Sequence, residues 1–264
     1  QPTLDVEDAT GDEDTPIALD IDTGLTDIDG SESLSITISG VPTGASLSTG
    51  TDIGGGIWIL TPGELPGLSI TPPPGSDEDF DLTVTSTSEE EENGDTSSNT
   101  DTIHIVVNAV ADDPDLDVTD ATGNEDTAIA LDVSAALTDT DGSESLSDIT
   151  ISGVPTGASL SAGTDQGGGV WTVTAAETAG LTITPPANSD VDFALSISVT
   201  STEAENGDTG TTTGTINVTV VAVADAPNLT TADASGDEDT AISLSISDAL
   251  TDTDGSESLG DVTI

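Results

Sequence analysis

The sequence predicts an all-β protein made of tandem β-sandwich domains in a linear array. Short runs of Val, Ile, Leu and Thr alternate with turn residues such as Gly, Ser, Asp and Pro. The apolar periodicity of long helices is missing. The chain also repeats itself over a distance that suits a whole domain rather than one coil of a solenoid.

The repeat is marked by segments that end in Glu-Asp-Thr. Residues 11–15 return as 123–127 and as 236–240, which gives spacings of 112 (123 − 11) and 113 (236 − 123). Pro2, Pro114 and Pro227 each stand near the start of a copy. We therefore expect one domain over 1–113, a second over 114–226, and the N-terminal strands of a third over 227–264, as a piece of a longer array.

Alternating apolar residues place the strands of each copy in chain order. The first copy carries Ile17-Leu19-Ile21, Ile36-Ile38, Trp58-Leu60, Phe80-Leu82-Val84 and Ile103-Ile105-Val107. The second copy carries Ile129-Leu131-Val133, Ile149-Ile151, Trp171-Val173, Phe193-Leu195-Ile197 and Ile216-Val218-Val220. Asn-Gly at 93–94 and at 206–207 predicts a hairpin between the last two strands. About seven short strands in about 110 residues are typical of an immunoglobulin-like sandwich.

The charge of the chain is almost entirely negative. It has 52 Asp and Glu residues, no Lys or Arg, and a net charge of −52. Each carboxylate must therefore face water, a backbone donor or a metal ion. Repulsion on this scale opposes a compact state, and it excludes nucleic acid and acidic membrane surfaces as partners.

Each copy has one Trp and one Phe, so its hydrophobic core is small and its folded state needs a further source of stability. Without Cys there are no disulfides, and without Lys there is no Lys–Asn isopeptide bond. Metal binding is the remaining way to cross-link the fold. The missing cysteines also fit a protein that folds outside the cell.

Acidic residues recur in register in four clusters, and their hard oxygen ligands on Gly-containing loops suit Ca²⁺. The candidate ligands are the Glu-Asp-Thr cluster (Glu13, Asp14, Glu125, Asp126, Glu238, Asp239), the Asp-x-Asp loops (Asp27, Asp29, Glu32, Asp139, Asp141, Glu144, Asp252, Asp254, Glu257), the Ser-Asp-x-Asp cluster (Asp77, Asp79, Asp190, Asp192) and the linker cluster (Asp112, Asp113, Asp225).

Strand parity predicts which clusters meet. Domains that continue in a line need an odd number of strands, so that the chain enters at one end and leaves at the other. With seven strands, and Ala45–Ser48 treated as part of a crossover, the Glu-Asp-Thr and Ser-Asp-x-Asp clusters lie beside the outgoing linker. The Asp-x-Asp loop of the next copy approaches from the far side, which predicts an inter-domain calcium site. A full strand at Ala45–Ser48 would overturn this assignment.

The acidity is also compatible with two alternatives to metal binding. Acidic turns are often ordinary solvated loops, since Asp and Gly favour turns. Halophilic adaptation explains the charge, although not its concentration in the same loops of each copy. The spacing is not that of an EF-hand, because Gly directly follows the second Asp and no Glu occupies position twelve.

Several long strings resemble the tandem cadherin-like repeats of giant bacterial RTX-type adhesins. They are Glu-Asp-Thr-Ala-Ile (125–129), Leu-Thr-Asp-Thr-Asp-Gly-Ser-Glu-Ser-Leu (137–146), Ile-Ser-Gly-Val-Pro-Thr-Gly-Ala-Ser-Leu (151–160) and Ile-Thr-Pro-Pro-Ala-Asn-Ser-Asp-Val-Asp-Phe (183–193). The resemblance implies type I secretion, display at the bacterial cell surface, and calcium-rigidified extender domains that carry a distal binding domain. The nonapeptide of RTX β-rolls is absent from these residues, so the resemblance places the secretion signal and the adhesive tip elsewhere.

The expected function is therefore mechanical, with neighbouring repeats of the same chain as partners. The alternative is a subunit of a self-assembling extracellular filament, biofilm-matrix fibre or surface layer, with identical chains as partners. An enzyme is not expected, because the single His104 lies on the outward side of its strand and Cys, Lys and Arg are missing. Trp58 and Trp171 share a strand face with apolar residues, so we expect burial rather than carbohydrate binding. No apolar run predicts membrane insertion of this segment.

Overall fold

The computed structural model describes residues 1–27, 29–252 and 254–264. Within these ranges the regular structure is β, apart from the short 3-10 helix η1 (Pro62–Glu64), which confirms the all-β class. Contacts divide the chain into two compact units. Unit 1 comprises residues 1–113, 137–145 and 201–210, and unit 2 comprises residues 114–136, 146–200 and 211–264. The units are defined by contacts and the repeats by sequence, so the repeat boundaries stay a prediction.

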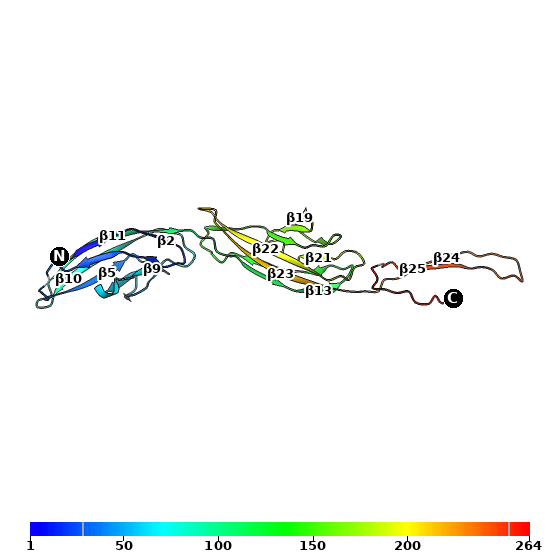
Figure 1. The fold of residues 1–264 in the computed structure, drawn as a ribbon, viewed down its shortest axis with the longest axis horizontal. Coiled ribbons are helices and arrows are strands. Elements are labelled where there is room, and N and C mark those ends of the chain that lie inside the picture. The colour runs from blue at the N-terminus through cyan, green and yellow to red at the C-terminus, as the bar shows by residue number, and fades with distance from the viewer. Residues whose placement is uncertain (28, 253) are drawn as a thin grey trace. The chain divides into compact units, whose positions relative to one another are not determined.

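The strands of the first repeat form two facing layers (Figure 1). The larger sheet has the order β2-β11-β10-β5-β8-β7, and a smaller one has the order β3-β9-β6 beside the pair β1-β4. Strands β2 and β11 pair in parallel, and their neighbours in the larger sheet pair antiparallel. The strands are β1 (Thr3–Val6), β2 (Ala9–Asp12), β3 (Ile17–Ala18), β4 (Ile21–Gly24), β5 (Glu32–Ser39), β6 (Ser46–Leu47), β7 (Thr51–Asp52), β8 (Ile57–Leu60), β9 (Ser69–Thr71), β10 (Phe80–Glu90) and β11 (Thr96–Asn108).

The core of unit 1 lies between these layers. Ile36 and Ile38 of β5, Leu82 of β10 and Ile103 of β11 are fully buried, and Ile70 of β9 meets them from the smaller sheet. Alternation produces this arrangement, because every second residue of a strand faces the same side. The β10–β11 hairpin predicted from Asn-Gly is confirmed: Thr96 pairs with Glu89, and Gly94 takes a left-handed φ of 74° in the turn.

The structure adds two short strands to the seven expected in the first copy. Ser46–Leu47 forms β6, where a crossover was expected, and pairs with β9. Thr51–Asp52 forms β7 and pairs with β8. If β1 with β2, and β3 with β4, are each counted as one interrupted strand, the first copy has nine strands, which is still an odd number. The strand at Ser46–Leu47 therefore does not reverse the ends at which the acidic loops lie.

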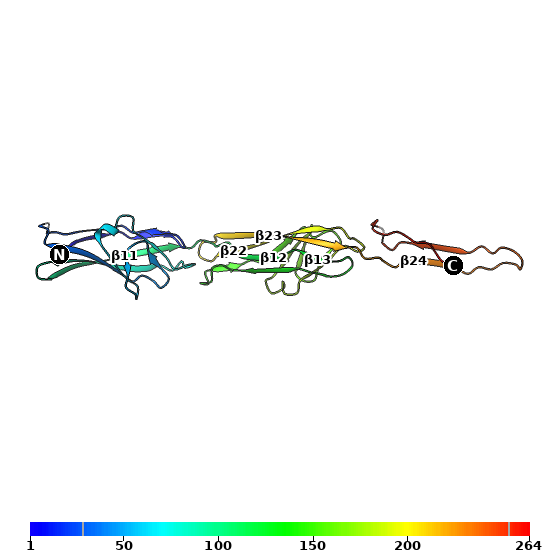
Figure 2. The same ribbon diagram turned by 90° about the horizontal axis from the view of Figure 1, so that it is seen from below.

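The strands of the second repeat follow the same order. The larger sheet runs β13-β23-β22-β17-β20-β19 with β16 beside β22, and the smaller sheets are β14-β21-β18 and β12-β15. Figure 2 shows β22 and β23 along one another. The strands are β12 (Asp115–Thr119), β13 (Ala121–Asn124), β14 (Ile129–Ala130), β15 (Asp132–Ala136), β16 (Glu144–Leu146), β17 (Ile149–Ser152), β18 (Ser159–Leu160), β19 (Thr164–Gly167), β20 (Val170–Val173), β21 (Thr182–Thr184), β22 (Phe193–Glu203) and β23 (Thr209–Val221).

The core of unit 2 repeats that of unit 1. Ile149 and Ile151 of β17, Leu195 of β22 and Ile216 of β23 are fully buried, with Ile183 of β21 facing them. Trp58 and Trp171 pack against their respective cores but are only partly buried. Their expected burial is thus incomplete.

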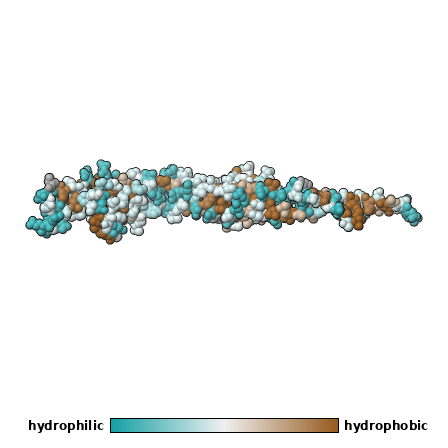
Figure 3. Space-filling model, turned by 60° about the horizontal axis from the view of Figure 1, so that its bottom comes forward, coloured by the Kyte–Doolittle hydropathy of each residue, from teal (hydrophilic) through white to brown (hydrophobic). Residues whose placement is uncertain are grey.

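Residues 227–264 contain the two-stranded sheet β24 (Asn228–Ala232) and β25 (Ser245–Ala249). Leu229, Ile242 and Leu244 are exposed here. Brown apolar surface is correspondingly visible among the teal and white residues in Figure 3. No helix within the described ranges is long and apolar enough to cross a membrane.

Candidate metal centre

The Glu-Asp-Thr segment forms a tight turn with an unusual backbone. Asp14 has a φ of 54°, and its counterparts Asp126 and Asp239 both have 56°. Asp and Asn tolerate this left-handed region better than other residues with a side chain. The hydroxyl of Thr15 donates to the carbonyl of Asp12 at 2.8 Å and closes the turn. The turn thereby fixes the directions of the two acidic side chains before the Thr.

Glu13 points from this turn into the protein and is only 4% exposed. Its Oε1 accepts a hydrogen bond from the backbone N–H of Val110 at 2.7 Å. Its Oε2 is buried without a hydrogen-bond partner among the described residues. A buried carboxylate oxygen without a donor is unfavourable unless a cation or a proton satisfies it.

Glu203 lies at the end of an inward-facing stripe. Residues 195, 197 and 199 of β22 are buried apolar residues, and the alternation continues through Ser201 to Glu203, which is 1% exposed. The strand thus carries a carboxylate to the position of a core residue. Its Oε2 is likewise buried without a partner in the described part of the chain.

Glu203 meets Asp139 and Glu144 in unit 1, where one carboxylate oxygen from each lies within 4.8 Å of the other two. Asp139 and Glu144 are 6% and 8% exposed. The Ser143 hydroxyl lies 2.9 Å from Asp139 Oδ2 and 3.3 Å from Glu203 Oε1. Glu144 Oε1 accepts from the backbone N–H of Asp112 at 2.6 Å, which joins the linker to this group. We name Glu13, Asp112, Asp139, Glu144 and Glu203 the unit 1 carboxylate cluster.

Gly75 brings the Ser-Asp-x-Asp loop against the same cluster. Its N–H donates to Asp14 Oδ1 at 3.0 Å. A Cβ on Gly75 would stand 2.5 Å from Asp139 Oδ1, and the residue has a φ of 56°. Both facts favour Gly there. The backbone N–H of Asp77, two residues on, helps to lower the pKa of Asp141.

Burial and mutual repulsion dominate the electrostatics of this cluster. The pKa of Glu13 is raised to about 7, mainly by burial and in part by neighbouring carboxylates, against a lowering by the hydrogen bond from the Val110 N–H. Burial also raises the pKa values of Asp112, Glu144 and Glu203. Burial raises the pKa of Asp141 as well, but hydrogen bonds, first those from Ser143, outweigh it and hold that pKa below its usual value.

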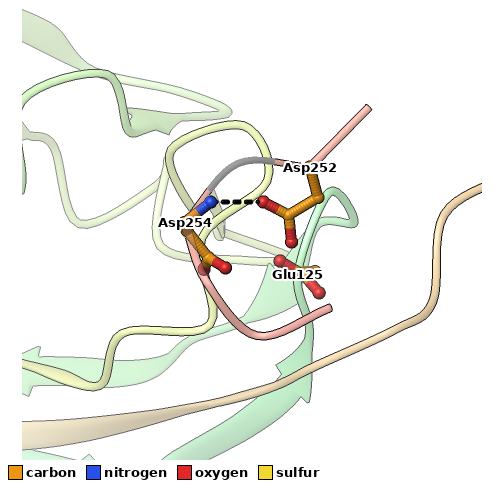
Figure 4. A group of neighbouring side chains, drawn as sticks. All are labelled: Glu125, Asp252 and Asp254. Atoms are coloured by element: carbon orange, nitrogen blue, oxygen red, sulfur yellow. Dashed lines mark hydrogen bonds between the residues drawn. The ribbon is translucent and has the colours of Figure 1, made fainter. Parts of the chain in front are cut away.

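Unit 2 contains a second group of three carboxylates, with one Glu and two Asp residues. Oxygens of Glu125, Asp252 and Asp254 lie within 4.8 Å of one another. Figure 4 shows the three carboxylates turned toward one another, with the Asp254 N–H donating to Asp252 Oδ1 at 2.9 Å. Glu125 Oε1 accepts a hydrogen bond from the Val223 N–H at 2.7 Å. This bond is equivalent to the one that the Val110 N–H donates to Glu13 in the first copy. Glu125 Oε2 is again buried and unpartnered among the described residues.

Three further predicted ligands, Asp126, Asp190 and Asp225, take part in hydrogen bonds near the second group. Asp126 Oδ1 accepts from the Asn188 N–H at 2.8 Å, as Asp14 does from Gly75. The Asp190 N–H approaches Asp254 Oδ2 at 3.5 Å. Asp225 donates its backbone N–H to Glu257 Oε1.

Several further predicted ligands lie apart from these groups or are used otherwise. Asp79 Oδ1 accepts from the Val107 N–H at 2.9 Å, and Asp192 Oδ1 from the Val220 N–H at 2.8 Å, so each ties its loop to the neighbouring strand. Asp27 and Asp29 are exposed, and Glu32 is partly buried in β5. Glu238 and Asp239 are exposed in the third copy. Binding of a metal by any of these residues stays a prediction.

Sequence reasoning missed Glu203. A signal was present, since Glu90 stands at the matching place in the first copy (203 − 90 = 113), also at the end of its strand before the Asn-Gly turn. The run Glu89–Glu92 hides this match. Only the alternation of β22 separates the inward Glu203 from the exposed Glu205.

The donor set fits a hard divalent cation. Five Glu Oε2 atoms are buried without a partner in the described ranges, at Glu13, Glu125, Glu144, Glu203 and Glu257. The chain offers no Lys or Arg to neutralise them. Carboxylate and backbone oxygens are the ligands that Ca²⁺ takes, six to eight at a time.

The single histidine lies outside these groups. His104 is half exposed on β11, as expected, and its Nδ1 lies 2.8 Å from Asp81 Oδ1. This bond raises the pKa of His104. Both side chains are exposed on the outer face of the sheet.

No family model and no curated protein matches the chain. Solved structures that resemble it include Drosophila N-cadherin EC1–3 (15% identity, TM-score 0.25, 84% of this chain and 68% of that one). An Escherichia coli adhesin, FdeC, aligns at 17% identity and a TM-score of 0.25 over 94% of this chain and 75% of its own. The Yersinia pseudotuberculosis adhesin InvE aligns at 14% identity and 0.26 over 81% and 58%. Since these TM-scores are low, the β-sandwich assignment rests on the strand order and the two cores.

Proposed function

We propose that the chain is an extender segment of a large secreted bacterial surface adhesin. Its tandem domains would be stiffened by Ca²⁺ and would hold a distal adhesive domain away from the cell. The observation that carries this proposal is that Glu13, Glu144 and Glu203 each bury an oxygen without a partner among the described residues, in a chain without Lys or Arg. The sequence strings that resemble RTX-type adhesins support the extracellular, cell-surface setting.

The carboxylate cluster would hold Ca²⁺ through Asp139, Glu144 and Glu203, with Glu13 and Asp112 as further oxygen donors. These residues come from the first turn, the linker, an Asp-x-Asp loop and the end of β22. A bound cation would neutralise their repulsion and fix four segments that are distant in sequence. Without it, the same residues would repel one another, and the segments would separate more easily. The role is mechanical and involves no catalysis.

Thermal unfolding and small-angle X-ray scattering, with excess calcium and with chelator, test the proposal. At a free calcium concentration 100 times Kd, each site that binds the folded state alone adds about 2.7 kcal/mol. We expect a large rise in melting temperature and a narrower distribution of shapes in calcium. Magnesium is the control, because it demands a smaller octahedral site. Stability that ignores calcium but rises in molar NaCl would contradict the proposal and indicate halophilic solvation.

Sedimentation in calcium separates the extender from a filament subunit. An extender segment should remain monomeric over a wide range of protein concentration. Calcium-dependent growth of large species, with the same rise in melting temperature, would keep the metal sites and replace the extender role by assembly with identical chains.

A further inference from the structure

A groove lies at the β7–β8 edge of the larger sheet in unit 1, and a matching groove lies at the β19–β20 edge in unit 2. The first has a volume of about 440 Å³ and is lined by Val41, Pro42, Gly44, Asp52, Gly56 and Trp58. The second has about 360 Å³ and is lined by Val154, Pro155, Gly157, Asp165, Gly169 and Trp171. Each residue of the second has the same identity as its counterpart 113 positions earlier.

The register places a carboxylate beside the indole in both grooves. Asp52 of β7 is directly opposite Trp58 of β8, and Asp165 is directly opposite Trp171. Directly opposed residues of antiparallel strands project from the same face, with Cβ atoms about 4.5–5.5 Å apart. Both Asp residues are exposed, and both Trp residues are partly buried against the core. Each groove therefore combines an aromatic wall with a charged and accessible rim.

The carboxylate is held in place by one oxygen. Asp52 Oδ1 accepts the N–H of Gly54 at 2.8 Å, and Asp165 Oδ1 accepts the N–H of Gly167 at 2.7 Å. In the described part of the chain, the second oxygen of each Asp has no hydrogen-bond donor. The groove thus presents a fixed negative charge whose counter-ion the chain cannot supply, since it has no Lys or Arg.

The opposite wall also depends on a specific backbone. The N–H of Val41 donates to the carbonyl of Gly56 at 3.2 Å, and a Cβ on Gly56 would collide with the Val41 carbonyl oxygen. Gly169 and Val154 repeat this, with a hydrogen bond of 3.1 Å and the same collision. The residue after Asp52 differs between copies, Ile53 against Gln166, although the lining does not. Packing of Trp on the core alone does not require the paired Asp.

We propose that each groove binds a guanidinium or ammonium group on a basic segment of a partner polypeptide. A cation over the face of Trp gains from the ring quadrupole, and Arg does so more often than Lys. The planar guanidinium also stacks on an aromatic ring while it hydrogen-bonds a carboxylate. The net charge of −52 attracts such a segment from a distance. This site is independent of the carboxylate clusters and of the calcium proposal.

Tryptophan fluorescence reports on these grooves alone, because the chain has only Trp58 and Trp171. In a Trp171→Phe variant, Trp58 reads the first groove. A Trp58→Phe variant reads the second through Trp171. We expect N-acetylarginine amide, titrated at constant ionic strength and constant calcium, to change the emission of each variant with saturation. Asp52→Asn in the first variant, and Asp165→Asn in the second, should each weaken the apparent affinity about fivefold.

Asp101→Asn is the matched control for charge, because Asp101 is exposed on β11 outside the groove and its change removes the same unit of charge. The neutral N-acetylcitrulline amide controls for shape. An equal loss in Asp52→Asn and Asp101→Asn would reduce the effect to general attraction and overturn the proposal. A response to citrulline equal to that of arginine, or a response to a neutral oligosaccharide but not to arginine, would also overturn it.

Discussion

The two Asp-x-Asp loops of unit 1 have similar sequences and different surroundings. In the loop at 27–32, Asp27 and Asp29 are exposed and accept hydrogen bonds from within the loop. In the loop at 139–144, Asp139 is 6% exposed, and Glu13 and Asp112 raise the negative potential beside it. We name these the open loop and the closed loop.

The difference shows what makes an acidic loop a candidate metal site. In the open loop, the Ser31 hydroxyl and N–H both bond Asp29 Oδ1 and lower the pKa of Asp29. Local donors therefore satisfy that carboxylate. In the closed loop, local donors also reach Asp139 and Asp141, but the Oε2 atom of Glu144 is buried and has no hydrogen-bond partner among the described residues. The motif supplies the carboxylate ligands, and the segments that pack over it bury them, so that a bound cation becomes favourable.

The largest effect is expected from Glu203→Gln, compared with Glu90→Gln at the open loop. Glu90 is opposite Glu32 in the β5–β10 register and is partly buried, whereas Glu203 is 1% exposed. Glu203→Gln should weaken calcium binding about tenfold or more, because affinity depends on the number of charged ligands. With chelator present, the same variant should be more stable than wild type, by on the order of 1 kcal/mol, because a buried like charge is gone.

Calorimetric calcium titration measures the loss of affinity, and urea unfolding with chelator measures the gain in the free energy of unfolding. Glu90→Gln should change both much less. If Glu203→Gln lowers stability equally with and without calcium, Glu203 is an ordinary structural residue and the closed loop is not distinguished from the open one.

The second effect concerns the pH dependence of stability without metal. The pKa of Glu13 is raised to about 7 from 4.5. A raised acid pKa means that the folded state holds the proton more tightly, so its stabilisation is complete below about 4.5 and is lost as pH rises to about 7. The free energy of unfolding with chelator should therefore fall across that window. Glu13→Gln should flatten the fall, and Asp27→Asn at the open loop should leave it unchanged.

Calcium should reverse this slope, because the cation binds the deprotonated carboxylates and its affinity rises as protons leave. Urea unfolding at several pH values, with calcium and with chelator, gives both slopes. A chelated protein whose stability rises steadily from pH 5 to pH 7 would contradict the buried state of Glu13.

The fold could be predicted further than the site. Alternation indicated the buried faces of β5, β10 and β11, and Asn-Gly placed the β10–β11 turn, because these depend on local periodicity. The two-residue strands β6 and β7 escaped, since pairing with β9 and β8 rather than their own sequence defines them. Glu203 escaped because its burial depends on the register of a long strand. The hydrogen bonds that occupy Asp79 depend on a neighbour 28 residues away.

A smaller effect is expected from substitution of Gly75, whose backbone lies against Asp139 of the closed loop. Gly75→Ala and Gly30→Ala both place a side chain at positive φ, 56° and 91°, at about 1–2 kcal/mol. The Cβ at Gly75 also meets Asp139 Oδ1, whereas nothing lies within 4 Å of a Cβ at Gly30. Both variants should therefore lose stability, but only Gly75→Ala should weaken calcium binding. Equal calcium affinities in the two variants would show that the Gly75 loop does not shape the cluster.

The smallest effect is expected from Asp29→Asn in the open loop. Because hydrogen bonds from Ser31 lower the pKa of Asp29, its ionised form stabilises the folded state above the ordinary Asp value, 3.8, and this contribution is lost as pH falls through the lower folded value. The variant should be slightly less stable than wild type at neutral pH, and the two should converge in acid. Chemical unfolding at both pH values measures the difference, with calcium absent. A large loss at neutral pH would mean that the open loop depends on its carboxylate for more than these two bonds, and the contrast with the closed loop would then be one of degree.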